Sequence, residues 1–253
     1  MIAAMIEFKS EREVRITVDE VAARRNADER ARLLLSAMER QNAASGDERV
    51  SFLTARPDRL QDFRGMRFEA YSNDRHGQDI KAILDHALPM EGEDYVAAYV
   101  RDVSSGRVGP EGEAVGEEKW WVVADRTGRS LGIAGLYEYT ADAPGHVWLN
   151  WFALRQDMQG TSLGSILLEY VMSHARRAGK KRIFMLTDDH ASMKDNYKFY
   201  QREGCAVEAL LDKTGVHIDA ACALPKGVLQ YLYKAHKPWI DEGVTWFLRS
   251  KAL

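Results

Sequence analysis

The chain has 253 residues, of which 45% are hydrophobic and 29% are charged, and its formal net charge is −3. This composition is typical of a globular protein with a substantial core. Because nucleic acid phosphates are usually bound by a basic face, the negative charge argues against nucleic acid as the main partner. No stretch approaches the roughly 20 apolar residues of a membrane span, and no cleavable leader is recognisable. We therefore expect a cytoplasmic protein that binds neither nucleic acid nor membrane.

The two cysteines, Cys205 and Cys222, are neither in a CxxC pair nor near a histidine at metal-ligand spacing. We expect two buried free thiols in a reducing compartment, and no metal site.

The first 65 residues read as a small unit of their own. Apolar and polar residues alternate over 14–18, which predicts a half-buried strand. Residues 17–20 form a capping box that opens an arginine-rich helix to about residue 41, and a second strand is expected over 50–55. This strand–helix–strand extension could serve dimerisation or regulation, or be the remnant of a second similar domain.

A second domain is expected over residues 66–253. Its predicted elements, in chain order, are a strand (67–71), two short helices (78–87 and 93–104), a glycine-rich loop (105–118), a hairpin (120–124 and 130–139), a strand (147–154), a long helix (160–178), a strand (182–187), a helix (193–203) and two strands (206–211 and 228–234). The tail, 238–253, contains Trp239, Trp246, Phe247 and Leu248. It either covers the core of its own chain or crosses to a second subunit, so a homodimer is possible.

The stretch from Phe152 to Ser165 is the most informative. An apolar strand runs into a turn with Gly160, and the turn opens an amphipathic helix that contains Gly164. The free backbone N–H groups and the positive dipole end of a helix's first turn suit a phosphate group. Taken alone, the pattern also fits an ordinary turn.

A second stretch forms a helix that ends at Gly204, with Phe199 and Tyr200 side by side near its end. Taken alone, a tyrosine there could equally be a half-buried structural ring.

In their order and spacing, the two stretches together resemble the GNAT acyltransferase family over about residues 66–234. The family's loop reads Gln/Arg-x-x-Gly-x-Gly/Ala; Gln159, Gly160, Leu163 and Gly164 match it, with Ser162 in place of the middle glycine. About forty residues later a Tyr-x-x-x-Gly pattern follows, matched by Tyr200 and Gly204. The resemblance implies an α/β (α+β) fold with a mixed, mostly antiparallel central sheet, two splayed strands, and helices on both faces.

The resemblance also implies a GNAT-type N-acetyltransferase that uses acetyl-CoA as co-substrate. Backbone groups of the strand would pair with the pantetheine arm, at Phe152, Ala153 and Leu154. The amides of the following loop would hold the pyrophosphate, at Gln159, Gly160, Thr161, Ser162, Leu163, Gly164 and Ser165. Asn196, on the second helix, is a further candidate contact of the cofactor. Tyr200 would protonate or hydrogen-bond the departing thiolate.

A base must remove a proton from the acceptor amine before attack. The family often places a carboxylate on the strand before the loop, and this strand has none. We predict a water relayed through Asn150 to Glu138 or His146, although each could be an ordinary strand-end residue.

Asp188 and Asp189 follow the strand that ends at Thr187, and there they would favour a cationic amine such as a polyamine, aminoglycoside or lysine-like group. They could equally be an acidic cluster at a helix N-terminus.

Three functions are compatible with these features. The first is acetylation of a primary amine on a small molecule. The second is acetylation of a protein lysine or N-terminus. The third is a non-catalytic domain that binds acyl-CoA as a sensor.

Overall fold

The computed structural model describes residues 5–10, 13–17, 32, 35–36, 49–53, 65–87, 119–138, 144–189, 194–220 and 222–253. The chain divides into two compact units. The first comprises Met1–Ser105, Lys119–Gly135 and Trp151–His174, and the second Gly106–Glu118, Leu136–Asn150 and Ala175–Leu253. The domain boundary expected at residues 65 and 66 stays a prediction.

A three-stranded sheet is formed near the N-terminus by β1 (Met5–Ser10), β2 (Glu13–Thr17) and β3 (Arg49–Leu53). β2 pairs antiparallel with β1 and parallel with β3. The two strands predicted here are confirmed, whereas β1 was not predicted. Of the helix expected between them, only Arg32, Leu35 and Ser36 are described, and all three are helical.

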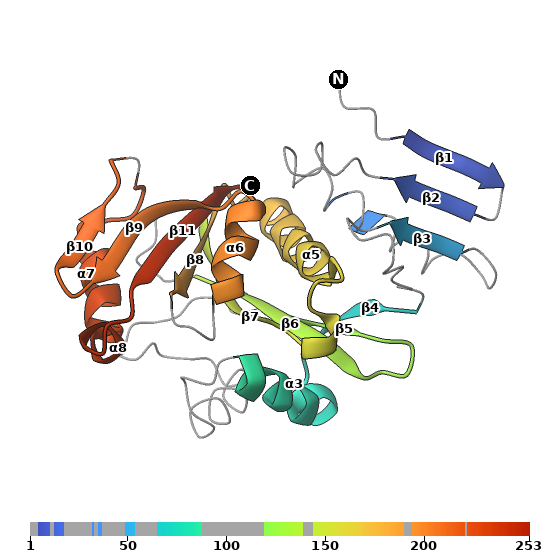
Figure 1. Ribbon diagram of the computed structural model, residues 1–253, viewed down its shortest axis with the longest axis horizontal. Helices are drawn as coiled ribbons and strands as arrows, with labels where there is room; N and C mark the ends of the chain where they lie inside the picture. Colours follow the sequence, from blue (N-terminus) through green and yellow to red (C-terminus); the bar gives the residue numbers. More distant parts are fainter. Residues whose placement is uncertain are drawn as a thin grey trace. The chain divides into compact units, whose positions relative to one another are not determined.

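A mixed sheet of eight strands forms the rest of the fold, in the order β10-β9-β11-β8-β7-β6-β5-β4 (Figure 1). The strands are β4 (Arg67–Ala70), β5 (Lys119–Ala124), β6 (Ser130–Tyr137), β7 (His146–Leu154), β8 (Arg182–Asp188), β9 (Ala206–Asp212), β10 (Gly215–Ile218) and β11 (Trp246–Ala252). The sheet is mostly antiparallel; β7 and β8 are parallel and pair from His146↔Arg182 to Trp148↔Phe184. The predicted α/β class with a mostly antiparallel sheet is confirmed.

The helices of this part are α3 (Asn73–Ala87), α5 (Leu163–Arg177), α6 (Lys194–Arg202), α7 (Lys226–Ala235) and α8 (Lys237–Asp241), with a short 3₁₀ turn η1 (Gln156–Met158). α3 begins five residues before the predicted start because Ser72 accepts the first helical hydrogen bonds, from the N–H groups of Arg75 and His76. The predicted helix 93–104 and loop 105–118 lie outside the described residues. Among those described, no helix is long and apolar enough to cross a membrane.

The strand predicted over 228–234 is wrong, because these residues belong to α7. The buried residues Leu229 and Leu232 are three apart, which is a helical spacing, and the tyrosines at 231 and 233 are partly exposed. Pro225, in an extended conformation, precedes the first helical residue and its carbonyl accepts from the N–H groups of Val228 and Leu229.

The C-terminal tail is a strand of its own chain's sheet. β11 lies between β8 and β9, with Trp246 opposite both Asp188 and Leu211 (Figure 1). Trp246 and Leu248 are buried there. The interpretation that the tail covers its own core is therefore confirmed, and a homodimer stays a prediction.

The core of the first unit lies around β5 and β6. One cluster joins Val123 and Leu131 to Met158, Leu163 and Ile166 from η1 and α5. A second cluster packs α3 against β5, and its members include Ile80, Ile83, Leu84, Trp120 and Ala153. α3 and the start of α5 are thus fixed by apolar contacts.

Candidate active site

β7 carries a backbone distortion at Trp151, whose φ is 45°. A bulky side chain rarely adopts the left-handed region, and such residues cluster where a strand is reshaped for a function. The Trp151 ring is half-buried and packs against the cluster of α3 and β5. Packing therefore holds the distortion in place, immediately before the three residues expected to pair with pantetheine. Of these, Ala153 is buried and Phe152 and Leu154 are half-buried.

The loop after β7 is built by local hydrogen bonds. The Arg155 N–H donates to the Leu131 carbonyl at 2.9 Å, which fixes the end of the strand, and the Thr161 hydroxyl donates to the Met158 carbonyl at 2.6 Å. Gly160 and Ser162 both have positive φ, 74° and 70°. The backbone therefore has a left-handed conformation at two of the last three positions before α5 begins.

The N-terminus of α5 is well suited to an anion. The Ser162 carbonyl accepts a helical hydrogen bond from the N–H of Ile166 at 3.2 Å, and a helix directs the N–H groups of its first turn toward its N-terminus. The first turn contains no acidic residue, so nothing in it competes with an anion for the positive dipole end. Leu163 and Ser165 are buried, whereas Gln159 and Gly160 are exposed. Phosphate binding by this loop stays a prediction.

Arg155 and Asp157 form a two-point ion pair beside this loop, with Nε–Oδ1 and Nη2–Oδ2 distances of 2.5 and 2.7 Å. The hydrogen bond from Arg155 holds the pKa of Asp157 below its usual value. Asp157 is thus an anion whose charge is balanced locally, which limits its repulsion of a phosphate.

Tyr200 lies in the second unit, near the end of α6, and only 6% of its surface is exposed. Gly204, with φ 78°, ends the helix: the N–H of Cys205 donates to the Tyr200 carbonyl at 2.9 Å and that of Gly204 to the Gln201 carbonyl at 3.1 Å. These two bonds define a Schellman motif. Burial raises the pKa of Tyr200 well above its ordinary value. The phenol therefore keeps its proton and is a better hydrogen-bond donor than an acid.

The candidates for the proton relay have other partners. The Glu138 carboxylate pairs with the ammonium of Lys180 at 2.5 Å. His146 stacks edge-on against Phe184, with ring centroids 5.0 Å apart. It is the first residue of β7 and lies four positions before Asn150, about 13 Å away at strand spacing. One water cannot bridge that distance. The relay stays a prediction, and His146 is not placed for a single-water step from Asn150.

The two aspartates predicted to bind the acceptor differ in their surroundings. Asp188 is 4% exposed and ends β8, opposite Trp246 of β11. Asp189 is exposed, and its Oδ1 accepts the N–H of Thr245 at 2.8 Å. Part of the function of Asp189 is therefore to continue the pairing of β8 with β11. Asn196 lies on α6 and is half-buried.

The site residues thus fall into two groups. The distorted end of β7 and the loop before α5 belong to the first unit, whereas Tyr200, Asn196, Asp188 and Asp189 belong to the second. The sequence did not indicate the strain at Trp151, since no residue type marks it. It also did not indicate the buried Arg249 near Tyr200, because that contact comes from a strand 49 positions further along the chain.

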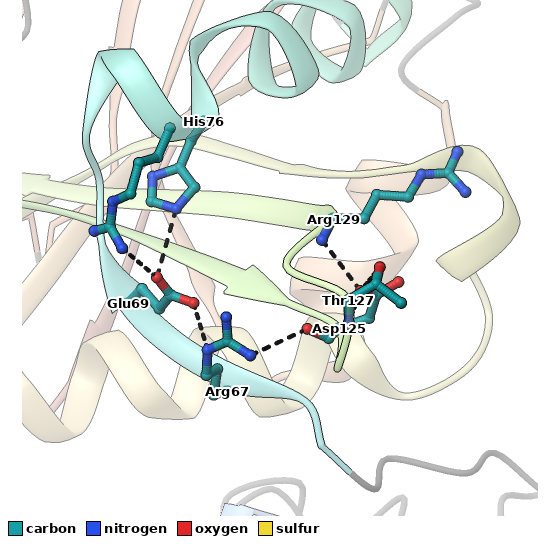
Figure 2. A network of polar contacts seen from close by, with 7 residues as sticks. Arg67, Glu69, His76, Asp125, Thr127 and Arg129 are labelled. Atoms are coloured by element: carbon teal, nitrogen blue, oxygen red, sulfur yellow. Dashed lines mark hydrogen bonds and ion pairs between the residues drawn. The ribbon is translucent and has the colours of Figure 1, made fainter.

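A second polar cluster links β4, α3 and the β5–β6 turn (Figure 2). Glu69 receives an ion pair from Arg67 at 2.5 Å and another from Arg75 at 2.9 Å, and the His76 ring lies 3.7 Å from the same carboxylate. Arg67 also donates to the Asp125 carbonyl at 3.4 Å. In the turn itself, hydrogen bonds from Thr127 and Arg129 hold the pKa of Asp125 below its usual value although burial alone would raise it. This cluster holds the edge of the sheet to its helix.

Together, the mixed sheet and the strand–turn–helix with two left-handed residues define an α/β protein. Residues 81–205 match the family model described as the acetyltransferase (GNAT) family. This region of the chain matches that family, and the resemblance inferred from the sequence is confirmed.

Several solved structures have a fold similar to that of this chain. A GNAT family protein from Desulfovibrio desulfuricans is 17% identical with a TM-score of 0.51, and the match covers 74% of this chain and 98% of that one. An acetyltransferase from Streptococcus agalactiae 2603 is 16% identical with a TM-score of 0.50, covering 75% and 99%. An aminoglycoside 6′-N-acetyltransferase complexed with coenzyme A is 14% identical with a TM-score of 0.50, covering 74% and 96%. At these identities the likeness concerns the fold alone. A comparison with curated proteins found no match.

Proposed function

We propose that this protein is an N-acyltransferase that transfers an acetyl group from acetyl-CoA directly to a primary amine of a small molecule. The observation that carries the proposal is the loop between β7 and α5. Two residues with positive φ turn the chain so that the first turn of α5, free of acidic side chains, faces the loop. A pyrophosphate is the ligand that this geometry suits best.

In the proposed reaction the neutral amine nitrogen attacks the thioester carbonyl carbon, a C–N bond forms, the nitrogen loses a proton to water, and the C–S bond breaks with its electron pair on sulfur. A backbone N–H near the distortion at Trp151 would polarise the carbonyl oxygen. Tyr200 would donate its hydroxyl hydrogen to the sulfur. A thiol has a pKa of about 8.5 and an ordinary tyrosine one of about 10, and burial raises that of Tyr200 further. Its contribution is therefore mainly a hydrogen bond to the thiolate.

The acceptor is proposed to be a cationic amine. Asp188 and Asp189 stand at the end of β8, and both carboxylates would attract such a group. Two structures with this fold are named aminoglycoside 6′-acetyltransferases, so multiply charged amines are the first compounds to screen. Asp189→Asn keeps an oxygen for the Thr245 N–H and removes the charge. It should raise KM for a cationic amine and leave KM for acetyl-CoA unchanged.

The first experiment is a thermal melt with acetyl-CoA, with longer acyl-CoAs and with free CoA. A ligand at about 100 times its Kd adds roughly 2.7 kcal/mol to the free energy of unfolding, which shifts the midpoint measurably. Dephospho-CoA and adenosine are controls that separate pyrophosphate binding from adenine binding. No shift from a folded sample would contradict the proposal.

Measuring the release of CoA then distinguishes the three candidate functions. Release of CoA in the presence of small amines supports the proposal, and release only with peptides indicates a protein lysine or N-terminal acetyltransferase. A melting shift without CoA release from any acceptor would indicate a non-catalytic acyl-CoA sensor.

A further inference from the structure

Two cationic side chains of β11 are buried on the same face of the strand. Arg249 is 1% exposed and Lys251 is 8% exposed. Burying a guanidinium or an ammonium group is costly unless hydrogen-bond acceptors surround it. The partners of these two cations therefore indicate why a sheet strand carries them.

Both cations bind the end of α6. The Lys251 ammonium donates to the Glu203 carbonyl, and Arg249 Nη1 donates to the Cys205 carbonyl at 3.3 Å. Arg249 Nε also donates to the hydroxyl of Thr187 in β8 at 3.2 Å. Cations at a helix C-terminus satisfy its last carbonyls and complement the negative end of its dipole. β11 thus anchors α6 to the sheet by two separate contacts.

The Arg249 contact continues to Tyr200 through Cys205. Arg249 holds the Cys205 carbonyl, and the N–H of the same residue caps the Tyr200 carbonyl at 2.9 Å. The positive charge of Arg249 also opposes the rise in the pKa of Tyr200 that burial causes. Lys251 instead binds the carbonyl of Glu203, one residue before the Gly204 of the Schellman motif.

We propose that Arg249 is a positioning residue for Tyr200: it fixes the C-terminal cap of α6 and supplies a positive charge beside the phenol where the thiolate develops. This rests on the proposed function, in which the C–S bond breaks with its electron pair on sulfur and the Tyr200 hydroxyl donates to that sulfur. The guanidinium lowers the energy of the negative charge that the sulfur and the phenol then share. No proton leaves Arg249.

A double-mutant cycle tests the proposal. Arg249→Met should lower kcat about 10- to 100-fold with little change in KM for acetyl-CoA, because misplacing a group by about 1 Å has effects of that order. In a Tyr200→Phe background the same change should lower kcat less than about twofold, since Arg249 acts through the lost hydroxyl. If the two losses multiply instead, the proposal is overturned.

Lys251→Met is the matched control, because it removes the other buried cation that binds α6. It should lower the melting temperature as Arg249→Met does, while its effect on kcat should be equal in the wild-type and Tyr200→Phe backgrounds. Coupling of Lys251 to Tyr200 as strong as that of Arg249 would contradict the assignment. If Arg249→Met does not fold, Arg249→Lys serves, since it keeps the charge and loses the two-point contact. Its loss of kcat must again disappear in the Tyr200→Phe background.

The positioning role and the proposed chemistry can fail separately. If Tyr200→Phe alone leaves kcat unchanged at saturating substrate, the proposed role of the phenol is wrong. Hydrogen exchange then still tests the anchor. Arg249→Met should accelerate exchange of the Gly204 and Cys205 amides more than that of α5, and equal acceleration of both helices would refute a specific contact.

Discussion

Ser162 shows how a single position deviates from the pattern of its family. The GNAT loop has glycine there, and the structure gives the reason: φ at this residue is 70°, in the left-handed region. A residue with a Cβ pays about 1–2 kcal/mol for that conformation. This chain keeps the same turn with a serine at position 162, and it therefore keeps the strain of the left-handed conformation.

Ser162→Gly should relieve this strain. A glycine loses about 0.5–1 kcal/mol more entropy on folding, so the net gain in the free energy of unfolding should be about 0.5–1 kcal/mol. Urea unfolding measures it. Ser162→Val is the opposing variant and should destabilise the protein by more than Ser162→Gly stabilises it. A loss of stability in Ser162→Gly would indicate that the hydroxyl makes a contact worth more than the strain.

His76 is a second residue with a testable charge state. Its ring is buried, and Nδ1 accepts the N–H of Ser72 at 3.0 Å, which caps α3. Burial, and then the charge of Arg75, lower the pKa of His76, while Glu69 and Asp79 oppose the shift (Figure 2). A protonated ring has no acceptor nitrogen, so protonation removes this cap.

We expect this histidine to make the fold acid-sensitive. Because the folded-state pKa lies below the ordinary 6.5, the unfolded chain binds more protons, so stability is complete above pH 6.5 and falls as pH drops through the folded pKa. The slope cannot exceed about 1.4 kcal/mol per pH unit for one group. His76→Gln keeps an acceptor and should flatten this part of the profile of unfolding free energy against pH. His236, whose pKa burial also lowers, contributes to both proteins and cancels in the difference. Identical profiles would show that His76 does not titrate.

Among the helices and strands, the sequence predicted correctly those whose ends are marked by several local signals. The β5–β6 hairpin, the end of α5 at Gly179 and the end of α6 at Gly204 were all predicted, since glycine at positive φ marks each turn. Elements that depend on partners far away in the sequence were not predicted. β11 is inserted between β8 and β9 by contacts 35 or more positions away. β1 and β10 were also missed, although each pairs with its neighbour in the chain, β2 or β9, across a short turn.

The same distinction holds for the candidate site. The loop before α5 and Tyr200 lie in contiguous motifs, so the resemblance to the family could predict them from the sequence, and their roles stay predictions. The distortion at Trp151 results from packing against α3, and the environment of Tyr200 results from β11. α7 was mistaken for a strand because its tyrosines and valine favour strands, and only the sheet it packs against decides between the two.

Two glycines that end helices provide a matched pair. Gly179 and Gly204 have φ of 77° and 78°, and neither has an atom closer than 4.0 Å to an added Cβ. Alanine at either position should therefore cost about 1–2 kcal/mol of stability from backbone conformation alone. Only Gly204→Ala should also lower kcat, because α6 carries Tyr200. Equal kcat in the two variants, at equal loss of stability, would contradict a role for the end of α6 in catalysis.

For the molecule as a whole, one question is whether the first 65 residues fold independently of residues 66–253. Leu35 bears on it: it is 6% exposed and belongs to the cluster of Met66, Val123, Leu131, Met158, Leu163 and Ile166. A residue of the expected extension is thus part of the core that holds the start of α5, and with it the phosphate-binding loop.

Leu35→Ala should therefore destabilise the whole first unit. Removing a buried leucine costs about 2–5 kcal/mol, since the neighbours fill the cavity only in part. Thermal unfolding should show a lower midpoint for the transition that acetyl-CoA shifts, since the ligand's loop and Leu35 contact the same cluster. Ser36→Ala, at the adjacent half-buried position, should change stability by less than about 0.5 kcal/mol. If Leu35→Ala leaves the acetyl-CoA-sensitive transition unmoved and lowers a separate one, the extension folds on its own and the shared core is refuted.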